Sequence, residues 1–109
     1  MNVNVLKSDD YSIISIEGRV DTTNADEFEK AVMEVVESGI NKIILNCSGL
    51  NYISSSGLRV FLIVQKKMMA TKGQLRLCSL LPGIREIFEI SGFTTIFSIF
   101  PDQQSAVKE

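Results

Sequence analysis

The chain has 109 residues, of which 45% are hydrophobic and 22% are charged, and its formal net charge is -2. This length and composition predict a single domain over residues 1–109 with a real hydrophobic core, and the acidic balance argues against a nucleic-acid-binding face. The sequence contains no histidine, which excludes a Ser-His-Asp triad, a histidine general base and the usual histidine-containing zinc sites.

An antiparallel β-hairpin is predicted at the start of the chain. Residues 3–5 and 11–17 alternate between apolar and polar side chains with a period of two, which is typical of strands. The two aspartates at residues 9–10 lie between these runs and are expected to form the turn. Gly18 is expected to end the second strand.

A helix is predicted to follow, with Gly39 as its C-cap. Thr23 and Asp26 have a capping-box-like spacing, and the Asp26 carboxylate lies where the helix dipole favours a negative charge. An apolar stripe at helical spacing consists of Ala25, Phe28, Val32, Val35 and Val36.

The serines that follow the next strand are the feature around which the chain is organised. Residues 43–45 form a short continuous apolar run, which is typical of a strand buried on both faces. Three serines and a glycine come after it, at residues 54–57, and Ser55 or Ser56 is a natural N-cap for the next helix. The pattern places serine hydroxyls at the positive end of a helix just past a buried strand, where open α/β sheets usually carry their functional site.

The helix after the serines is predicted from an apolar stripe made of Leu58, Phe61, Leu62, Met68 and Met69. Val60, Ile63 and Val64 lie outside this stripe, so the helix is apolar over much of its circumference. We therefore expect it to be covered on two sides or to be partly exposed for a partner.

The rest of the chain predicts short strands at residues 74–78 and 95–99. It also predicts a helix that begins at Pro82 and ends at Gly92, and a short terminal helix that begins at residues 101–102. The whole order of elements predicts an α/β fold, with a mixed sheet of four to five strands packed against about four helices.

Cys47 and Cys78 each end a predicted buried strand, and we expect free thiols that act as small apolar side chains. They are too few and too far apart for a structural zinc site. No stretch approaches the apolar length of a membrane span, and the N-terminus has no basic region followed by an apolar run. We therefore expect a cytoplasmic protein that does not insert into membranes and that uses no metal or cofactor.

The run from Asn46 to Leu58, Asn-Cys-Ser-Gly-Leu-Asn-Tyr-Ile-Ser-Ser-Ser-Gly-Leu, resembles the signature of the STAS family. This family contains bacterial anti-sigma factor antagonists and domains appended to sulphate transporters. Residues 18–22, Gly-Arg-Val-Asp-Thr, and residues 81–93, which begin Leu-Pro-Gly-Ile, resemble two further segments of the family in the same order. The likeness covers the whole chain and implies a STAS-like fold.

The resemblance implies a phosphorylation site at Ser55, which stands where the family has its phosphorylated serine. Ser56 stands at a Ser or Thr position of the family and is otherwise explained as a helix cap. Ser54 replaces the family's usual aspartate, Asn46 replaces another acidic residue, and Arg59 stands where glycine is common. The loop is therefore less acidic than the family pattern.

A partner-binding face is implied around this serine, made of Asp21, Ser54, Ser56, Gly57, Leu58 and Arg59. A structural role for Asp21, in a turn or at the start of a helix, explains this residue as well as a role in the partner face does. Arg59 is either a solvated helix residue or a contact for a phosphate. A side chain in place of Gly57 is expected to leave the fold intact but to block the close approach of a partner kinase.

The resemblance implies an anti-sigma factor antagonist that regulates sigma-factor-dependent transcription. Its unphosphorylated form would capture an anti-sigma factor that is also a serine kinase, phosphorylation would release it, and a serine phosphatase would restore it. The alternative is a non-switching STAS subunit, such as the small cytoplasmic component of a lipid-transport ABC complex. An enzyme is not expected, because the serines lack the preceding glycine of a hydrolase nucleophile elbow and the chain has no Gly-x-x-x-x-Gly-Lys loop.

Overall fold

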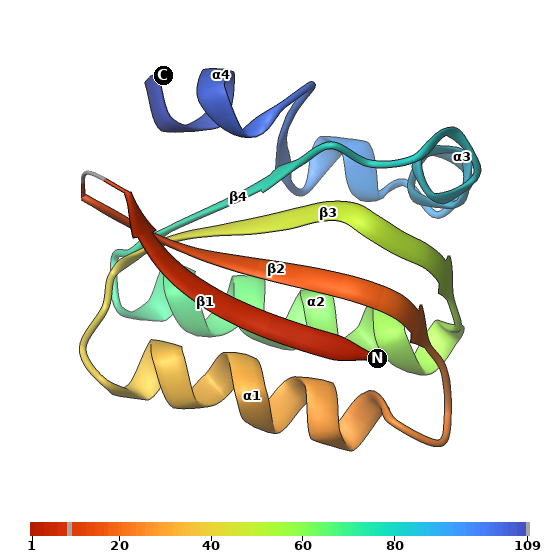
Figure 1. Ribbon diagram of the computed structural model, residues 1–109, viewed down its shortest axis with the longest axis horizontal. Coiled ribbons are helices and arrows are strands. Elements are labelled where there is room, and N and C mark those ends of the chain that lie inside the picture. Colours follow the sequence, from red (N-terminus) through yellow and green to blue (C-terminus); the bar gives the residue numbers. More distant parts are fainter. Residues whose placement is uncertain (9, 109) are drawn as a thin grey trace.

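The computed structural model describes residues 1–8 and 10–108 and is built on one mixed β-sheet (Figure 1). Its strands are β1 (Asn2–Ser8), β2 (Tyr11–Val20), β3 (Lys42–Ile53), β4 (Gln74–Cys78) and β5 (Ser98–Phe100). They lie side by side in the order of the chain; β1 is antiparallel to β2, and the other neighbouring pairs are parallel. This confirms the N-terminal hairpin, whose turn includes Asp10; the other expected turn residue, Asp9, lies outside the described residues.

Helices cover both faces of the sheet (Figure 1). The described residues form four α-helices, namely α1 (Ala25–Glu37), α2 (Ser55–Ala70), α3 (Pro82–Ile90) and α4 (Gln103–Lys108). α1 and α2 lie on one face, and the short α4 lies on the other. Together with the five strands, these helices confirm the predicted α/β class. No helix among the described residues has both the length and the apolar character needed to cross a bilayer.

α3 lies beside β3 because β4 is short. β4 pairs only with Lys42–Asn46 of β3, and α3 contacts β3 further along (Figure 1). Phe88 of α3 then packs edge-on against Phe61 of α2, with 5.5 Å between ring centroids. The main core consequently joins the sheet, both long helices and α3.

The buried side chains form two clusters, one on each face of the sheet. The larger cluster includes Ile14, Ile16, Val20, Phe28, Val32, Ile43, Leu45, Cys47, Phe61, Val64, Leu77 and Phe88. The smaller cluster, under α4, consists of Tyr11, Ile13, Ile44, Cys78 and Ala106. Both cysteines are free and buried, and burial raises the pKa of both thiols, as expected of thiols that act as small apolar residues.

β3 extends to Ile53, well past the apolar run at residues 43–45 that predicted it. In its second half Leu50 and Ile53 are buried, whereas Ser48 and Asn51 are exposed. The expectation that the strand ends near Cys47 is wrong: beyond it only every third residue is buried, because the pairing with β2 shifts register twice, and the polar residues between resemble a loop in sequence.

β2 likewise continues past Gly18, its expected end, to Val20. Gly18 has a φ of +97° and lies where the pairing of β2 with β3 shifts register. Glycine adopts this backbone conformation without a steric penalty, so the residue bends the strand where it was expected to end it.

The buried face of α2 is rotated from the one expected, although Phe61 and Met68 of the predicted stripe are buried. Its buried residues are Gly57, Val60, Phe61, Val64 and Met68. Met69, which was placed in the apolar stripe, is 67% exposed. Because this helix is apolar over much of its circumference, hydrophobic spacing alone does not determine which side meets the sheet.

The last strand is shorter and later than expected. Residues 98–100 form β5, and residues 93–95 form a turn of 3-10 helix in place of the predicted start of a strand at Thr95. Phe93, the first residue of that turn, and Phe97, just after it, are buried, and their rings pack in a tilted arrangement with 5.7 Å between centroids. Their burial in the main core accounts for the turn.

Candidate functional site

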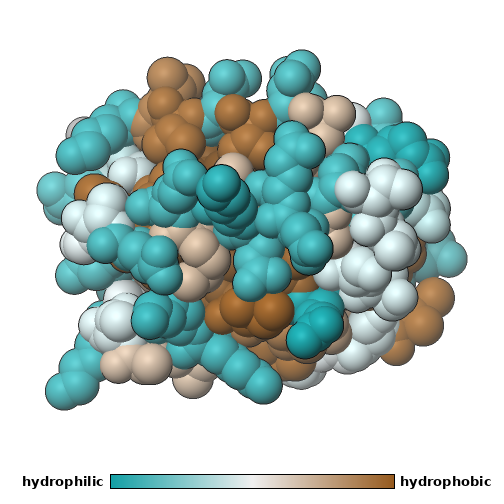
Figure 2. All heavy atoms as spheres, turned by 90° about the horizontal axis from the view of Figure 1, so that it is seen from below, coloured by the Kyte–Doolittle hydropathy of each residue, from teal (hydrophilic) through white to brown (hydrophobic). Residues whose placement is uncertain are grey.

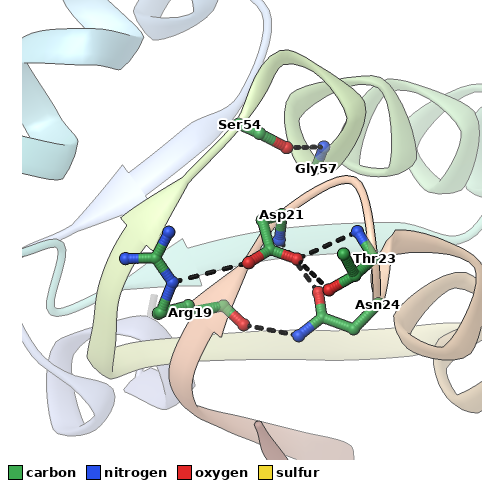
Figure 3. A network of polar contacts seen from close by, with 6 residues as sticks. All are labelled: Arg19, Asp21, Thr23, Asn24, Ser54 and Gly57. Carbon is green, nitrogen blue, oxygen red and sulfur yellow. Dashed lines mark hydrogen bonds and ion pairs between the residues drawn. The ribbon is translucent and has the colours of Figure 1, made fainter.

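The candidate site lies where β2 and β3 end side by side (Figure 3). In this parallel pair Arg19 is opposite Tyr52 and Val20 is opposite Ile53. The backbone N–H of Ser54 donates to the carbonyl of Val20 at 2.9 Å, which extends the pairing by one residue. The register therefore brings the residues that follow each strand, Asp21 and Ser54, to the same edge of the sheet.

Ser54 is the N-cap of α2. Its backbone is extended, with φ -89° and ψ 173°, and its hydroxyl oxygen accepts a hydrogen bond from the N–H of Gly57 at 3.2 Å. The expectation that Ser55 or Ser56 forms the cap is wrong. β3 continues up to Ile53, so the first serine is the one that leaves the strand with the geometry a cap requires.

Ser55 is consequently the first residue of α2, and its side chain is exposed. Among residues 1–8 and 10–108, no side-chain hydrogen bond involves the Ser55 hydroxyl, and no backbone bond uses the N–H of Ser55 or Ser56 as donor. These N–H groups belong to the helix turn that has no intrahelical acceptors and carries positive partial charge. An anionic group on Ser55 would meet two free donors.

Gly57 does not form part of the exposed surface. A Cβ at this position would lie 2.7 Å from Cγ1 of Ile53 and 2.9 Å from Cγ1 of Val20. Real side chains essentially never approach so closely, so the absence of a side chain lets α2 lie against the ends of both strands. The expectation that a larger residue here would leave the fold undisturbed is therefore wrong, because it must displace Ile53 or Val20; its effect on a partner stays a prediction.

The remaining predicted residues lie around the end of α2. Ser54, Ser56, Leu58 and Asp21 are half-buried, whereas Arg59 is exposed. Leu58 packs against the main core, so only part of its side chain faces outward. The structure thus brings all of the predicted residues to one end of the sheet, with Gly57 beneath the others.

Asp21 is held by a local hydrogen-bond network (Figure 3). Its carboxylate accepts bonds from the Thr23 hydroxyl at 2.6 Å and the Thr23 N–H at 3.0 Å, and it pairs with Nε of Arg19 at 3.4 Å. The bond from the Thr23 hydroxyl, the bond from the Thr23 N–H, and the charge of Arg19 lower the pKa of Asp21. Asp21 is therefore a fixed negative charge at neutral pH.

The expected capping box at the start of α1 does not form. The N-cap is Asn24, with no side-chain cap bond, and the Thr23 hydroxyl is engaged by Asp21. The amide of Asn24 instead closes the loop: its oxygen accepts from the Asp21 N–H and its nitrogen donates to the Arg19 carbonyl, both at 2.9 Å (Figure 3). The loop shape is thus fixed from both ends.

Arg19 and Tyr52 also lie at the candidate site, and sequence reasoning missed them. The Arg19 guanidinium carbon lies 4.3 Å from the centre of the Tyr52 ring, a cation–π distance, and Tyr52 is 41% exposed. Arg19 belongs to the Gly-Arg-Val-Asp-Thr segment, but its partner becomes identifiable only from the register of β2 against β3.

A groove of about 390 Å³ runs between the beginnings of α1 and α2. It is lined by Thr22, Ala25, Asp26, Glu29, Ser56, Arg59, Val60 and Ile63. Figure 2 views the molecule from the side of α1 and α2, where polar side chains surround smaller hydrophobic areas. Acidic groups of α1 thus face Arg59 of α2 next to the serines.

No group of three or more potential metal ligands occurs among the described residues.

The two adjacent serines should respond differently to truncation. Ser54→Ala removes the cap and should lower the free energy of unfolding by about 0.5 to 2 kcal/mol. Ser55→Ala removes an exposed hydroxyl and should change it by no more than about 0.5 kcal/mol. Urea unfolding of both variants checks this, and a larger loss for Ser55→Ala would mean that the cap is misplaced.

A valine at Gly57 should destabilise the protein by about 1 to 3 kcal/mol or more, because its side chain overlaps Ile53 and Val20. Gly83→Val is the matched control, since a Cβ there meets nothing within 4 Å, and it should cost less than about 0.5 kcal/mol. Thermal unfolding distinguishes the two variants, and equal stabilities would contradict the packing role of Gly57.

Comparison with known sequences places the chain in a family. The sequence model of the STAS domain matches residues 2–106. A relative from Bordetella bronchiseptica, named "Putative anti-sigma factor antagonist BtrV", is 39% identical over 106 residues, which cover 97% of this chain and 91% of the relative.

Solved structures agree on the fold. An anti-sigma factor antagonist from Mycobacterium paratuberculosis superposes with a TM-score of 0.90 at 21% identity, covering 98% of this chain and 91% of the other. The anti-sigma factor antagonist SpoIIAA in its unphosphorylated form superposes with a TM-score of 0.82 at 18% identity, covering 97% and 93%. This chain belongs to the STAS domain family and, within it, to the bacterial anti-sigma factor antagonists.

Proposed function

We propose that the surface around Ser55 binds an anti-sigma factor, and that phosphorylation of Ser55 by the serine kinase activity of that partner ends the complex. The observation that carries the proposal is the position of Ser55: it is exposed, it is the first residue of α2, and no described side chain bonds its hydroxyl. Ser54 is committed to the cap and Ser56 is half-buried in the groove, so Ser55 is the most accessible of the three.

The electrostatics of this position favour a switch that acts in the interface. A phosphate adds about 1.5 to 2 negative charges, and the free N–H groups of Ser55 and Ser56 at the helix N-terminus stabilise such a charge. The fold is therefore expected to survive the modification. The name SpoIIAA also belongs to a structure determined in a phosphorylated form, which superposes on this chain with a TM-score of 0.75.

Unlike the fold, the interface with the partner is expected to be disrupted by the phosphate. Asp21 already places a negative charge near Ser55, and a phosphate would add to it on the same face. A partner that fits the unmodified surface must then desolvate or repel the added charge. Ser54, Ser56, Leu58 and Arg59 are proposed to complete this face, with Arg59, one turn along α2, as a contact for the phosphate.

In the proposed cycle this chain supplies the serine and the kinase supplies ATP. The chain itself is proposed to have no catalytic activity. Capture of the anti-sigma factor frees a sigma factor for transcription, and a serine phosphatase returns the phosphorylated chain to the active pool. This proposal places the chain in the cytoplasm, where sigma factors act.

Phosphate labelling of serine variants tests the assignment. Parent protein, Ser54→Ala and Ser56→Ala should each gain one phosphate from the partner kinase and ATP, whereas Ser55→Ala should gain none. Intact-mass measurement reads the result, and circular dichroism at the assay temperature verifies that Ser54→Ala, which lacks its cap, is folded. Full labelling of Ser55→Ala, with loss of label in one of the other two variants, would assign the phosphorylation site to that other serine instead.

Ser55→Asp tests the interface mechanism. The carboxylate should change the free energy of unfolding by a favourable ~0.3 to 1 kcal/mol, because it lies at a helix N-terminus. Affinity for the anti-sigma factor should fall at least about tenfold, since a like charge or an unpaired buried charge costs more than about 1.4 kcal/mol in an interface. Titration calorimetry measures the affinity, with Ser55→Ala as the matched variant that retains binding.

The non-switching alternative makes a distinct prediction in the same experiments. A scaffold subunit needs no phosphate on Ser55, so none of the three serines would be labelled by kinases of its own cell. Ser55→Asp would also bind its partner normally. That combination would overturn the switch.

A further inference from the structure

A second concave site lies at the other end of the sheet from the serines, where β2, β3 and β4 begin (Figure 1). This basic pocket has a volume of about 280 Å³ and is lined by Asp10, Tyr11, Lys42, Gln74, Arg76, Val107 and Lys108. Among the described residues, its lining contains three cationic side chains and one carboxylate, in a chain whose net charge is -2. The described lining is therefore more positive than the chain as a whole.

Arg76 is held in place by contacts with uncharged groups. Its guanidinium carbon lies 5.3 Å from the centre of the Tyr11 ring and 5.1 Å from that of Phe100. Its Nη1 donates to the carbonyl of Ala106 at 2.6 Å. Among the described residues no carboxylate lies within ion-pair distance of it. A guanidinium carries five donors, so several remain available to an acceptor in the basic pocket.

Lys42 provides a second cation over the same aromatic ring. Its ammonium lies 5.8 Å from the Tyr11 ring centre and 3.7 Å from a carboxylate oxygen of Asp10. The Asp10 side chain is 83% exposed, and such an exposed pair is weak. Asp10 therefore competes only weakly with a ligand for Lys42.

A fixed neutral donor adjoins these charges. The Tyr11 hydroxyl donates to Oε1 of Gln74 at 3.1 Å, which orients the Gln74 amide and leaves its NH₂ group as a donor. With Lys108 on the rim, the basic pocket presents donors and positive charge from three strands and α4. A planar guanidinium fork combined with ammonium groups matches a tetrahedral oxyanion.

We infer that the basic pocket binds a small anion that bears a phosphate group. Sites for drug-sized ligands measure roughly 300 to 1,000 Å³, so a pocket below that range fits a phosphate or a small phosphorylated metabolite. The site shares no lining residue with the serine face and lies at the opposite end of β3. It is thus a binding function separate from the proposed phosphorylation switch, and neither depends on the other.

Titration of the ¹⁵N-labelled protein with inorganic phosphate, against sodium chloride of equal ionic strength, tests the inference. Saturable shifts are expected at the amides of Lys42, Gln74 and Arg76. Lys42→Gln should weaken binding about tenfold, because it removes a charge-assisted hydrogen bond. Asp10→Asn should tighten binding severalfold, because it frees Lys42. Tighter binding of ribose 5-phosphate than of phosphate would identify a metabolite as the ligand.

Matched variants separate a site from general screening. Lys66→Gln and Glu27→Gln change the net charge as Lys42→Gln and Asp10→Asn do, but they lie on exposed positions of α2 and α1. Both should bind phosphate within about twofold of the parent. Loss of affinity in Lys66→Gln equal to that in Lys42→Gln, or no saturable shift at the basic pocket, would overturn the inference. Unchanged amide spectra elsewhere verify that each variant is folded.

Discussion

The close approach of Gly57 to Ile53 and Val20 is the contact on which the geometry of the serine face depends. It sets the first turn of α2 directly against the ends of β2 and β3, and this fixes the rotation of the helix about its axis. Val60, Phe61, Val64 and Met68 then point into the core, because they share the face of Gly57. The same rotation directs Ser55 outward.

Three identical side chains in succession receive three different environments from that arrangement. Ser54 accepts the Gly57 N–H and is used by the fold, Ser56 faces the groove toward α1, and Ser55 alone is exposed. A phosphate on Ser54 would disrupt the cap. A phosphate on Ser55 would extend into solvent over free N–H groups. The site is therefore selected by its place in the helix turn, which a run of serines does not reveal by itself.

The sequence predicted those features that depend on neighbouring residues. The hairpin, the apolar stripe of α1 and the proline at the start of α3 are all local signals, and the structure contains them. The extent of β3, the cap at Ser54 and the contact of Arg19 with Tyr52 depend on strand register and on which faces are covered. Register is set by packing between segments that are distant in sequence. Hydrophobic spacing therefore predicted the strands and helices that carry the site, but not which of their residues meet there.

The charge of the serine face comes from residues outside the serine segment. Asn46 to Leu58 contains no carboxylate, so the carboxylates beside the serines come from other segments: Asp21 from the end of β2, and Asp26 and Glu29 from α1. Arg19 partly balances Asp21 at 3.4 Å while also lying over Tyr52. Arg59 likewise faces the α1 carboxylates, so charges of both signs lie around the serines, and a single phosphate of about -1.5 to -2 would shift this face strongly toward negative. The same phosphate would change the surface less in a loop that already carried several carboxylates. The low number of acidic residues in this loop therefore increases the difference in charge between the proposed unphosphorylated and phosphorylated forms.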